Sequence, residues 1–280
     1  MLATLVRRLS ARRKFWRFLP GLVILVPLII VALVTPLLPL EDPVLPHPAQ
    51  RNKAPSPEHV FGTDTYGMDV FSRVLHAARL DFLLTLLCVV LAVAIGAPLG
   101  AAAGYFGGWL ENVTERLVEI VQSFPIMLFA MMIQIAVGRS VTNLIIVIGV
   151  YIAPFYAKLV RSIVKPLRDV EFIQAARVTG QSSVQILLRH LLPNSIPPII
   201  SQFTLSAAVA IRTLSGLSFL GLGVQTPTPE WGSMIQVGAG WMVFGKWWPS
   251  VFPGLALFLV VWGLTRISEE IESMYTLREE

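Results

Sequence analysis

The sequence has little charge, a single cysteine and few histidines. Charged residues make up 14% of the 280 residues, against about 25% in a typical soluble domain. This shortage excludes a disordered chain and is not typical of a soluble enzyme. Cys88 has no partner for an internal disulfide, and its apolar neighbours favour a small buried hydrophobe over a reactive thiol. The 4 histidines show no metal-ligand spacing, so no metal site is expected.

The missing charge is missing in blocks. A helix that crosses the hydrocarbon core of a bilayer needs about 20 apolar residues. Uncharged runs of suitable length cover residues 18–40, 82–110, 120–138, 140–157, 190–211 and 247–265. The sequence therefore predicts an all-α integral membrane protein with six transmembrane helices. The first run is longer than the h-region of a signal peptide, about 7–15 residues, and is expected to be an uncleaved anchor.

The basic residues indicate an orientation. With the N-terminus in the cytoplasm, fifteen Lys and Arg residues fall in inside segments and six in outside segments. By the positive-inside rule both termini are expected to be cytoplasmic. The expected order is a cytoplasmic tail (1–17), the first span (18–40), an external segment (41–81), a transmembrane core (82–267) with a cytoplasmic loop 161–193 and an external loop 222–246, and a cytoplasmic tail (268–280). The net charge of +5 then reflects topology, and no nucleic-acid partner is expected.

The cytoplasmic loop 161–193 has the signals of a helix followed by a turn. Asp169 suits an N-cap, and Gly180 suits the C′ position that ends a helix. The small side chains of Ala175 and Ala176 would let the surface of another protein approach closely. The sequence therefore predicts a helix and a glycine turn that together present a docking surface.

A second helix is expected after this turn. Ser182 or Ser183 can cap it, and Pro193 is expected to end it. The alternative is that the whole loop is a plain connector, although connectors are usually shorter than this one.

The external segment 41–81 begins with several prolines, which predict an irregular, extended chain. From Met68 onward, apolar residues recur at helical spacing. This pattern predicts an amphipathic helix along the membrane surface before the second span.

Three separate motifs resemble those of a known family. The stretch Glu171-Phe-Ile-Gln-Ala-Ala-Arg-Val-Thr-Gly180 resembles the EAA loop of bacterial ABC-importer permeases. Phe61-Gly-Thr-Asp64 with Gly67-Met-Asp69 resembles the external signature of the dipeptide/oligopeptide/nickel permeases. Ser218-Phe-Leu-Gly-Leu-Gly-Val-Gln225 and Pro229-Glu-Trp-Gly-Ser233 resemble the C-type subunit of that family. The chain is thereby identified as resembling a type I ABC-importer permease subunit of the bacterial inner membrane.

The resemblance implies a coupling helix that seats in a groove of a separate ATPase. The residues that would contact or anchor it are Glu171, Gln174, Ala175, Ala176, Gly180, Leu192 and Pro193. The implied partners are a homologous second permease forming a heterodimer, two ABC ATPase subunits, an extracytoplasmic solute-binding protein and membrane lipid. The chain has no Gly-x-x-x-x-Gly-Lys-Ser/Thr loop. No cofactor is therefore expected on this chain, with ATP and Mg on the ATPase subunits.

The resemblance also suggests peptides as the substrate class, with a nickel chelate or another small polar or anionic solute as the alternative. Some positions depart from the family pattern. Gln174 stands where the motif usually has Glu, Met68 replaces an Arg, and Leu214 stands where many relatives carry an acidic residue. The motifs alone therefore do not identify the substrate of this chain.

Candidate pathway residues lie in the predicted spans. Arg212 is the one charged residue inside a span, where it lines the pathway, pairs with the partner permease or snorkels outward to the external end. Gln134 is a polar candidate, and Met131 belongs to a methionine group that is more typical of gap-filling than of metal passage. The residues expected to form the external signature and gate are Phe61, Gly62, Thr63, Asp64, Asp69, Glu230 and Trp231.

Two other classes of protein are disfavoured. An intramembrane enzyme would need paired acids, a nucleophile with its base, or metal ligands within the spans. A self-contained ion-coupled carrier would need intramembrane acids and usually shows inverted repeats. Neither set of features is visible in the sequence, which favours a non-catalytic subunit of an ATP-driven transporter.

Overall fold

A computed structural model describes residues 19–276 of the chain. Within that range the secondary structure is helical, apart from one isolated bridge between Thr63 and Asp69. The all-α architecture predicted from the uncharged runs is therefore confirmed. The predicted tail 1–17 and the residues 277–280 lie outside the described range.

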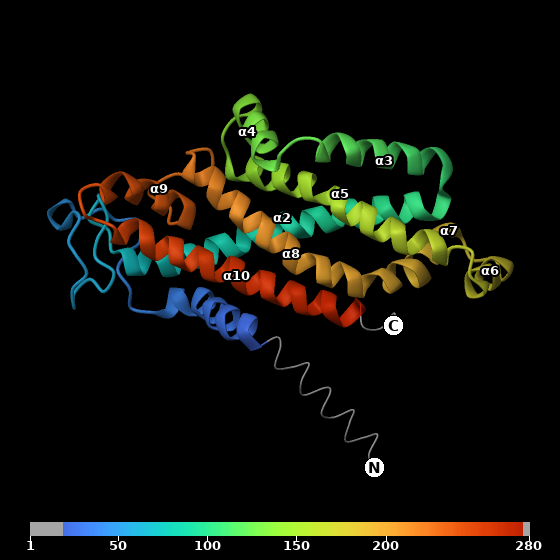
Figure 1. The fold of residues 1–280 in the computed structure, drawn as a ribbon, viewed down its shortest axis with the longest axis horizontal. Helices are drawn as coiled ribbons and strands as arrows, with labels where there is room; N and C mark the ends of the chain where they lie inside the picture. Colours follow the sequence, from blue (N-terminus) through green and yellow to red (C-terminus); the bar gives the residue numbers. More distant parts are fainter. Residues whose placement is uncertain (1–18, 277–280) are drawn as a thin grey trace, which may run out of the picture. The chain divides into compact units, whose positions relative to one another are not determined.

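The helices follow one another along the chain (Figure 1). The first helix covers residues 19–34 and continues into the 3-10 turn η1 (Thr35–Leu37). The other elements are η2 (Pro48–Gln50), α2 (Val70–Phe106), α3 (Gly108–Gln122), α4 (Ile126–Val137), α5 (Val141–Leu167), α6 (Glu171–Val178), α7 (Ser183–Ile186), the π-helical turn η3 (Leu187–Leu191), α8 (Leu192–Phe219), α9 (Trp231–Met242) and α10 (Trp248–Thr276).

Four of these helices are long and apolar enough to cross a membrane. They cover Leu19–Leu37, Val70–Phe106, Val141–Leu167 and Trp248–Glu272. A fifth candidate results if α3 and α4 are counted as one bent span. α8 has 28 residues and two internal prolines and is not among these candidates. The number of six spans therefore stays a prediction.

α2 joins two elements that the sequence analysis separates. The amphipathic stretch from Met68 and the second predicted span form one continuous helix of 37 residues. The residues at the expected junction, around Asp81, contain neither proline nor glycine, so nothing in the local sequence ends the helix there. The second span therefore begins as a direct extension of the external segment.

The third uncharged run, residues 120–138, does not form a single helix, because its first residues end α3 and most of the others form α4. α3 ends at Gln122 and α4 begins at Ile126, with an angle of 88° between them. Pro125 precedes the first residue of α4 and cannot continue the hydrogen bonding of α3, which explains the break. The Tyr151 hydroxyl of α5 donates a hydrogen bond of 2.9 Å to the carbonyl of Phe124 and holds the bend.

The chain divides into two compact units. One contains the residues up to Leu84 and those from Ala207 onward, and the other contains Thr85–Ser206. In the first unit α9 packs on α10 (Figure 1), and the core gathers side chains from the first helix, α2, α9 and α10 around Trp231. This core fixes the external segment to the start of α2.

In the second unit α2 and α5 meet backbone against backbone. Gly96, Gly100 and Gly104 are spaced four residues apart and therefore share one face of α2. A Cβ added at Gly100 would lie 2.2 Å from the carbonyl oxygen of Ala157, and one at Gly96 would lie 2.1 Å from that of Ala153. Only glycine permits this approach.

We expect Gly100→Ala to destabilise the second unit by about 1–3 kcal/mol, because the new methyl group forces two helix backbones apart. The measurement is the melting temperature of the purified complex in detergent. Gly240→Ala is the matched control, since a Cβ there meets nothing within 4 Å and alanine is the better helix former by about 0.5–1 kcal/mol. Equal melting temperatures for wild type and Gly100→Ala would contradict the close approach of the α2 and α5 backbones at this glycine.

Candidate functional site: a cytoplasmic docking helix and an external cap

The predicted docking surface is built around α6. Ile173 and Ala176 of this helix are buried in a core that also contains Tyr105, Ile186 and Leu191. Arg177 lies over the ring of Tyr105, with 5.3 Å between the guanidinium carbon and the ring centroid. α6 is therefore fastened to the rest of the second unit along one face.

Gly180 ends α6 as the sequence predicts. Its φ is +83°, in the left-handed region that glycine favours. The amide of Gly180 donates to the carbonyl of Arg177 (3.0 Å), and the amide of Gln181 donates to that of Ala176 (3.1 Å). These two bonds form a Schellman motif and reverse the chain tightly after the helix.

The start of α6 differs from the prediction. Val170, and not Asp169, occupies the N-cap position, and no side chain caps the helix there. The Asp169 carboxylate lies 3.1 Å from Nε of Arg168, and its carbonyl accepts a bond of 2.9 Å from the Gln174 amide. The prediction of Asp169 as N-cap is wrong because α6 begins at Glu171, which places Asp169 one residue before the N-cap position.

The second helix also differs in part. Ser182, one of the two predicted serines, caps α7. It forms a complete capping box with Gln185. α7 does not end at Pro193, because it runs through η3 into α8, which begins at Leu192. Pro193 lies in the first turn of α8, where the missing amide hydrogen of proline is tolerated.

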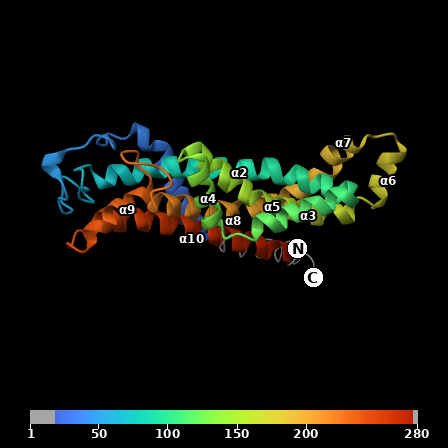
Figure 2. The same ribbon diagram turned by 90° about the horizontal axis from the view of Figure 1, so that it is seen from above.

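α6 and α7 lie next to each other at one end of the second unit (Figure 2), and many side chains of this segment are exposed. Among the predicted contact residues, Glu171, Gln174, Ala175, Gly180 and Pro193 are exposed, whereas Leu192 is half-buried. Ala176 is only 6% exposed. It therefore packs against the core below α6 and supports the docking surface from inside.

Four large apolar side chains share this outward surface and were not predicted. Val178 is 88% exposed, and the others are Phe172, Val184 and Leu188. Exposed apolar patches of this kind are typical of protein–protein contacts. The sequence analysis missed them because it searched for small and charged residues, although their position in a polar loop was a visible signal.

The external signature residues form a cap on the first unit. Asp64 accepts hydrogen bonds from the amides of Tyr66 (2.8 Å) and Met68 (3.0 Å), and its carboxylate lies 3.5 Å from Nε of Arg73. Burial raises the pKa of Asp64 above its ordinary value. The attraction of Arg73 and these hydrogen bonds offset only part of that rise. Arg73 also donates to the carbonyl of Pro227 (3.0 Å) and so connects two external loops.

The remaining signature residues pack around Trp248 and Phe252. Phe61 stacks on Phe252 with 3.9 Å between ring centroids. The Trp248 indole donates to the carbonyl of Thr63 (3.0 Å), and a Cβ added at Gly62 would lie 2.7 Å from the Trp248 ring. The structure thus brings together Phe61, Gly62, Thr63, Asp64 and Asp69, which the sequence motif only suggested.

Two buried carboxylates hold the start of α9. Glu230 accepts bonds from the amides of Gly232 (2.9 Å) and Ser233 (2.7 Å), and Asp81 accepts one from the amide of Trp231 (3.1 Å). Burial raises the pKa of Glu230, an effect that these amide bonds reduce. Asp81 was missed in the sequence because it stands at the edge of an uncharged run, 150 residues from Trp231.

The candidate pathway residues are placed differently from one another. Arg212 is exposed on α8 between the buried residues Ile211 and Thr213, and it forms no ion pair with another residue in the described range 19–276. Gln134 is fully buried, and with its side-chain amide turned to match its neighbours it donates to the carbonyl of Gly138 (3.1 Å) and accepts from the amide of Leu144 (2.9 Å). Gln134 therefore holds the α4–α5 turn in this structure. Met131 is half-buried.

The comparisons with known proteins settle the family. Residues 96–269 match the model of the family described as "Binding-protein-dependent transport system inner membrane component". The chain belongs to this family. As a member it is a membrane component of a transporter and not the subunit that hydrolyses ATP, and family membership implies an ATPase and a binding protein as partners.

Curated relatives of this permease are named after the solutes that they transport. It is 39% identical to the dipeptide transport system permease protein DppC of Alkalihalophilus pseudofirmus, over 89% of this chain and 82% of that protein. It is 41% identical to the glutathione transport system permease protein GsiD of Shigella flexneri, over 75% of this chain and 69% of that protein. The resemblance to C-type ABC permeases drawn from the motifs is therefore confirmed.

Solved structures support the fold of the permease. An amino acid ABC transporter crystallised with histidines superposes with a TM-score of 0.54 at 13% identity, covering 73% of this chain and 94% of that one. The methionine ABC transporter MetNI in an inward-facing conformation gives a TM-score of 0.50 at 20% identity, covering 71% and 96%. At these identities the likeness concerns the fold alone.

Proposed function

We propose that this chain is one of two permease subunits of an ATP-driven importer of small peptides. The chain pairs with a homologous permease, rests on two ATPase subunits and receives its cargo from an extracytoplasmic binding protein. Both termini face the cytoplasm, as the fifteen-to-six distribution of basic residues indicates. ATP and Mg belong to the ATPase subunits.

The observation that carries this proposal is the two-sided character of α6. One face closes a core within the chain, and the other exposes Glu171, Gln174 and Ala175 beside the apolar Val178. Exposed apolar side chains beside polar ones are typical of a surface that another protein covers. The ATPase is the partner that family membership supplies on the cytoplasmic side.

The peptide class rests on the relatives that are permeases for dipeptides and glutathione. Purification of the complete complex with its binding protein, followed by mass spectrometry of the co-purified ligand, tests it. We expect short peptides with free carboxyl termini. Recovery of a nickel chelate or of an unrelated polar solute in their place would overturn the peptide assignment and leave the transporter class intact.

Arg212 favours a substrate with a carboxylate. A cation that is exposed on a helix crossing a bilayer has to face a partner or an aqueous pathway, because contact with lipid costs a few kcal/mol or more. The immediate neighbours of Arg212 are buried, so its side chain points away from the packed side of α8. We place Arg212 on the wall of the transport pathway, which the second permease would complete.

We expect Arg212→Ala to lower uptake of a free-acid peptide by about tenfold or more, since a hydrogen bond to a charged group contributes about 1.5–3 kcal/mol. Uptake of the same peptide with an amidated C-terminus should change little. Arg116→Ala is the matched control, because the Arg116 side chain is 78% exposed and pairs only locally with Glu119. Equal losses for both peptides would argue for a structural role in the permease pair.

A further inference from the structure

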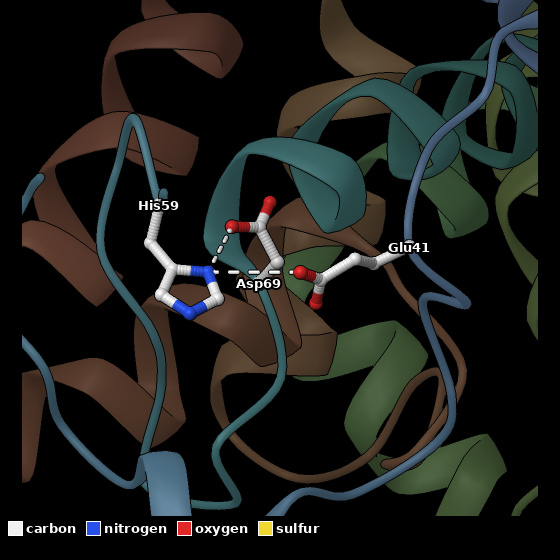
Figure 3. A group of neighbouring side chains, drawn as sticks. All are labelled: Glu41, His59 and Asp69. Atoms are coloured by element: carbon white, nitrogen blue, oxygen red, sulfur yellow. Dashed lines mark hydrogen bonds and ion pairs between the residues drawn. The ribbon is translucent and has the colours of Figure 1, made fainter. Parts of the chain in front are cut away.

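Three segments of the external region converge on one point. Glu41 follows the first helix, His59 lies in the loop before the signature motif, and Asp69 directly precedes α2 (Figure 3). Nδ1 of His59 lies 3.0 Å from Oδ2 of Asp69 and 3.8 Å from Oε1 of Glu41. One ligand atom from each residue thus falls within 4.8 Å of the other two.

These separations fit a single metal ion. Two ligand atoms that are each about 2.1 Å from a tetrahedral zinc ion lie about 3.4 Å apart. The observed distances of 3.0 Å and 3.8 Å lie on either side of that value. A small rotation of the exposed Glu41 side chain would equalise them. To bind the ion through Nδ1, the neutral imidazole has to carry its single proton on Nε2, so the proton between Nδ1 and Asp69 would move to Nε2 or be released to water.

The ligands are held in place by their surroundings. The amide of Ser72 donates to Oδ1 of Asp69 (2.8 Å), and the Ser72 hydroxyl donates to the backbone carbonyl of Glu41 (2.6 Å). The amide of His59 donates to the hydroxyl of Ser56 (3.2 Å). Such supporting bonds orient metal ligands in known sites. Two of the three side chains are buried, with His59 at 4% and Asp69 at 9% exposure, whereas Glu41 at 44% leaves an open side.

The local charge also favours a cation. The cluster contains two carboxylates, and its nearest strong base along the chain, Arg73, pairs with Asp64 instead. Within the described residues 19–276, Glu41 and Asp69 have His59 alone as their ion-pair partner. The imidazole by itself cannot neutralise two carboxylates, whereas a divalent ion can.

We propose that Glu41, His59 and Asp69 bind a divalent transition-metal ion of the Zn²⁺ type and thereby fasten the segment after the first helix to the start of α2. One imidazole and two carboxylates, without a thiolate, suit Zn²⁺ or Mn²⁺. The open side at Glu41 leaves a coordination position for water. The site was not expected from the sequence, since the gaps between these residues match no short metal-binding motif.

The test is zinc binding by the complete complex. The complex is purified with an affinity tag that contains no histidine, and bound metal is removed with a chelator. After reloading with Zn²⁺ and desalting, we expect one Zn²⁺ per permease chain by mass spectrometry, in excess of the ATPase subunits assayed alone. Zn²⁺ should also raise the melting temperature of the complex, and Mg²⁺ at the same concentration should not. Failure to retain zinc above the background would overturn the proposal, whatever solute the complex transports.

Two variants assign the zinc to these residues. Glu41→Gln is the decisive one, because an exposed side chain can change without disturbing the fold, and we expect it to weaken zinc binding at least about tenfold. His59→Gln should abolish binding. Glu58→Gln and His47→Gln are matched controls in the same external segment, outside the cluster. If the two cluster variants bind zinc as tightly as the controls do, His59 and Asp69 form only a structural hydrogen bond.

Discussion

Gly180→Asp is expected to reduce substrate uptake by at least tenfold while ATP hydrolysis by the complex continues. A Cβ at Gly180 meets nothing within 4 Å, so there is open space where the new side chain begins. The left-handed φ of +83° costs an ordinary residue about 1–2 kcal/mol, and aspartate is among the residues that tolerate it best. The loss of uptake would therefore arise outside the chain, where a carboxylate enters the contact with the ATPase.

Gly180→Asn separates this effect from backbone strain. Asparagine has the same shape and a similar tolerance of the left-handed region, but it carries no charge. Uptake and ATP hydrolysis are measured together in proteoliposomes that contain the complete complex and its binding protein. We expect Gly180→Asn to retain most of the transport. Normal uptake by Gly180→Asp would show that this turn does not form the coupling contact.

Trp231→Ala is expected to destabilise the external cap by about 3–5 kcal/mol, the usual cost of removing a large buried aromatic side chain. Trp231 is fully buried, its indole donates a bond of 3.1 Å to the carbonyl of Val74, and its ring lies edge-on to Phe82 at 6.2 Å. The measurement is the melting temperature of the purified complex. We expect a drop of several degrees or failure of the permease to assemble.

Two further variants make this result specific. Trp231→Phe keeps most of the volume and removes the indole hydrogen bond, which leaves the Val74 carbonyl without that partner and should cost about 1–3 kcal/mol. Trp109→Ala removes a tryptophan that is 76% exposed and should leave the melting temperature almost unchanged. Similar effects of Trp231→Ala and Trp109→Ala would indicate that Trp231 is not central to the cap.

The features that the sequence predicted correctly depend on local signals. Uncharged runs predict long apolar helices, and glycine at a C′ position predicts the Schellman turn at Gly180 because few other residues adopt that conformation. Ser182, one of the two serines expected to cap the second helix, does cap α7. Each of these inferences requires only residues within one or two turns of one another.

The features that it did not predict depend on contacts between distant residues. The burial of Ala176 follows from the packing of α6 on Tyr105, which is far away in the sequence. Asp81 looks like the polar edge of a span until α9 brings the amide of Trp231 to it. Likewise, Glu41 and His59 belong to segments without regular secondary structure, so no periodic pattern in the sequence indicates that they lie close together.

The two faces of α6 also separate two kinds of constraint on its sequence. Ile173 and Ala176 are buried and determine whether the helix stays on its own chain, while Glu171, Gln174 and Val178 are exposed and leave that core untouched. The exposed set can therefore diverge together with an ATPase, one substitution at a time, without loss of folding. Exchanging only these outer side chains between two such permeases would be a direct way to retarget one of them to the ATPase of the other.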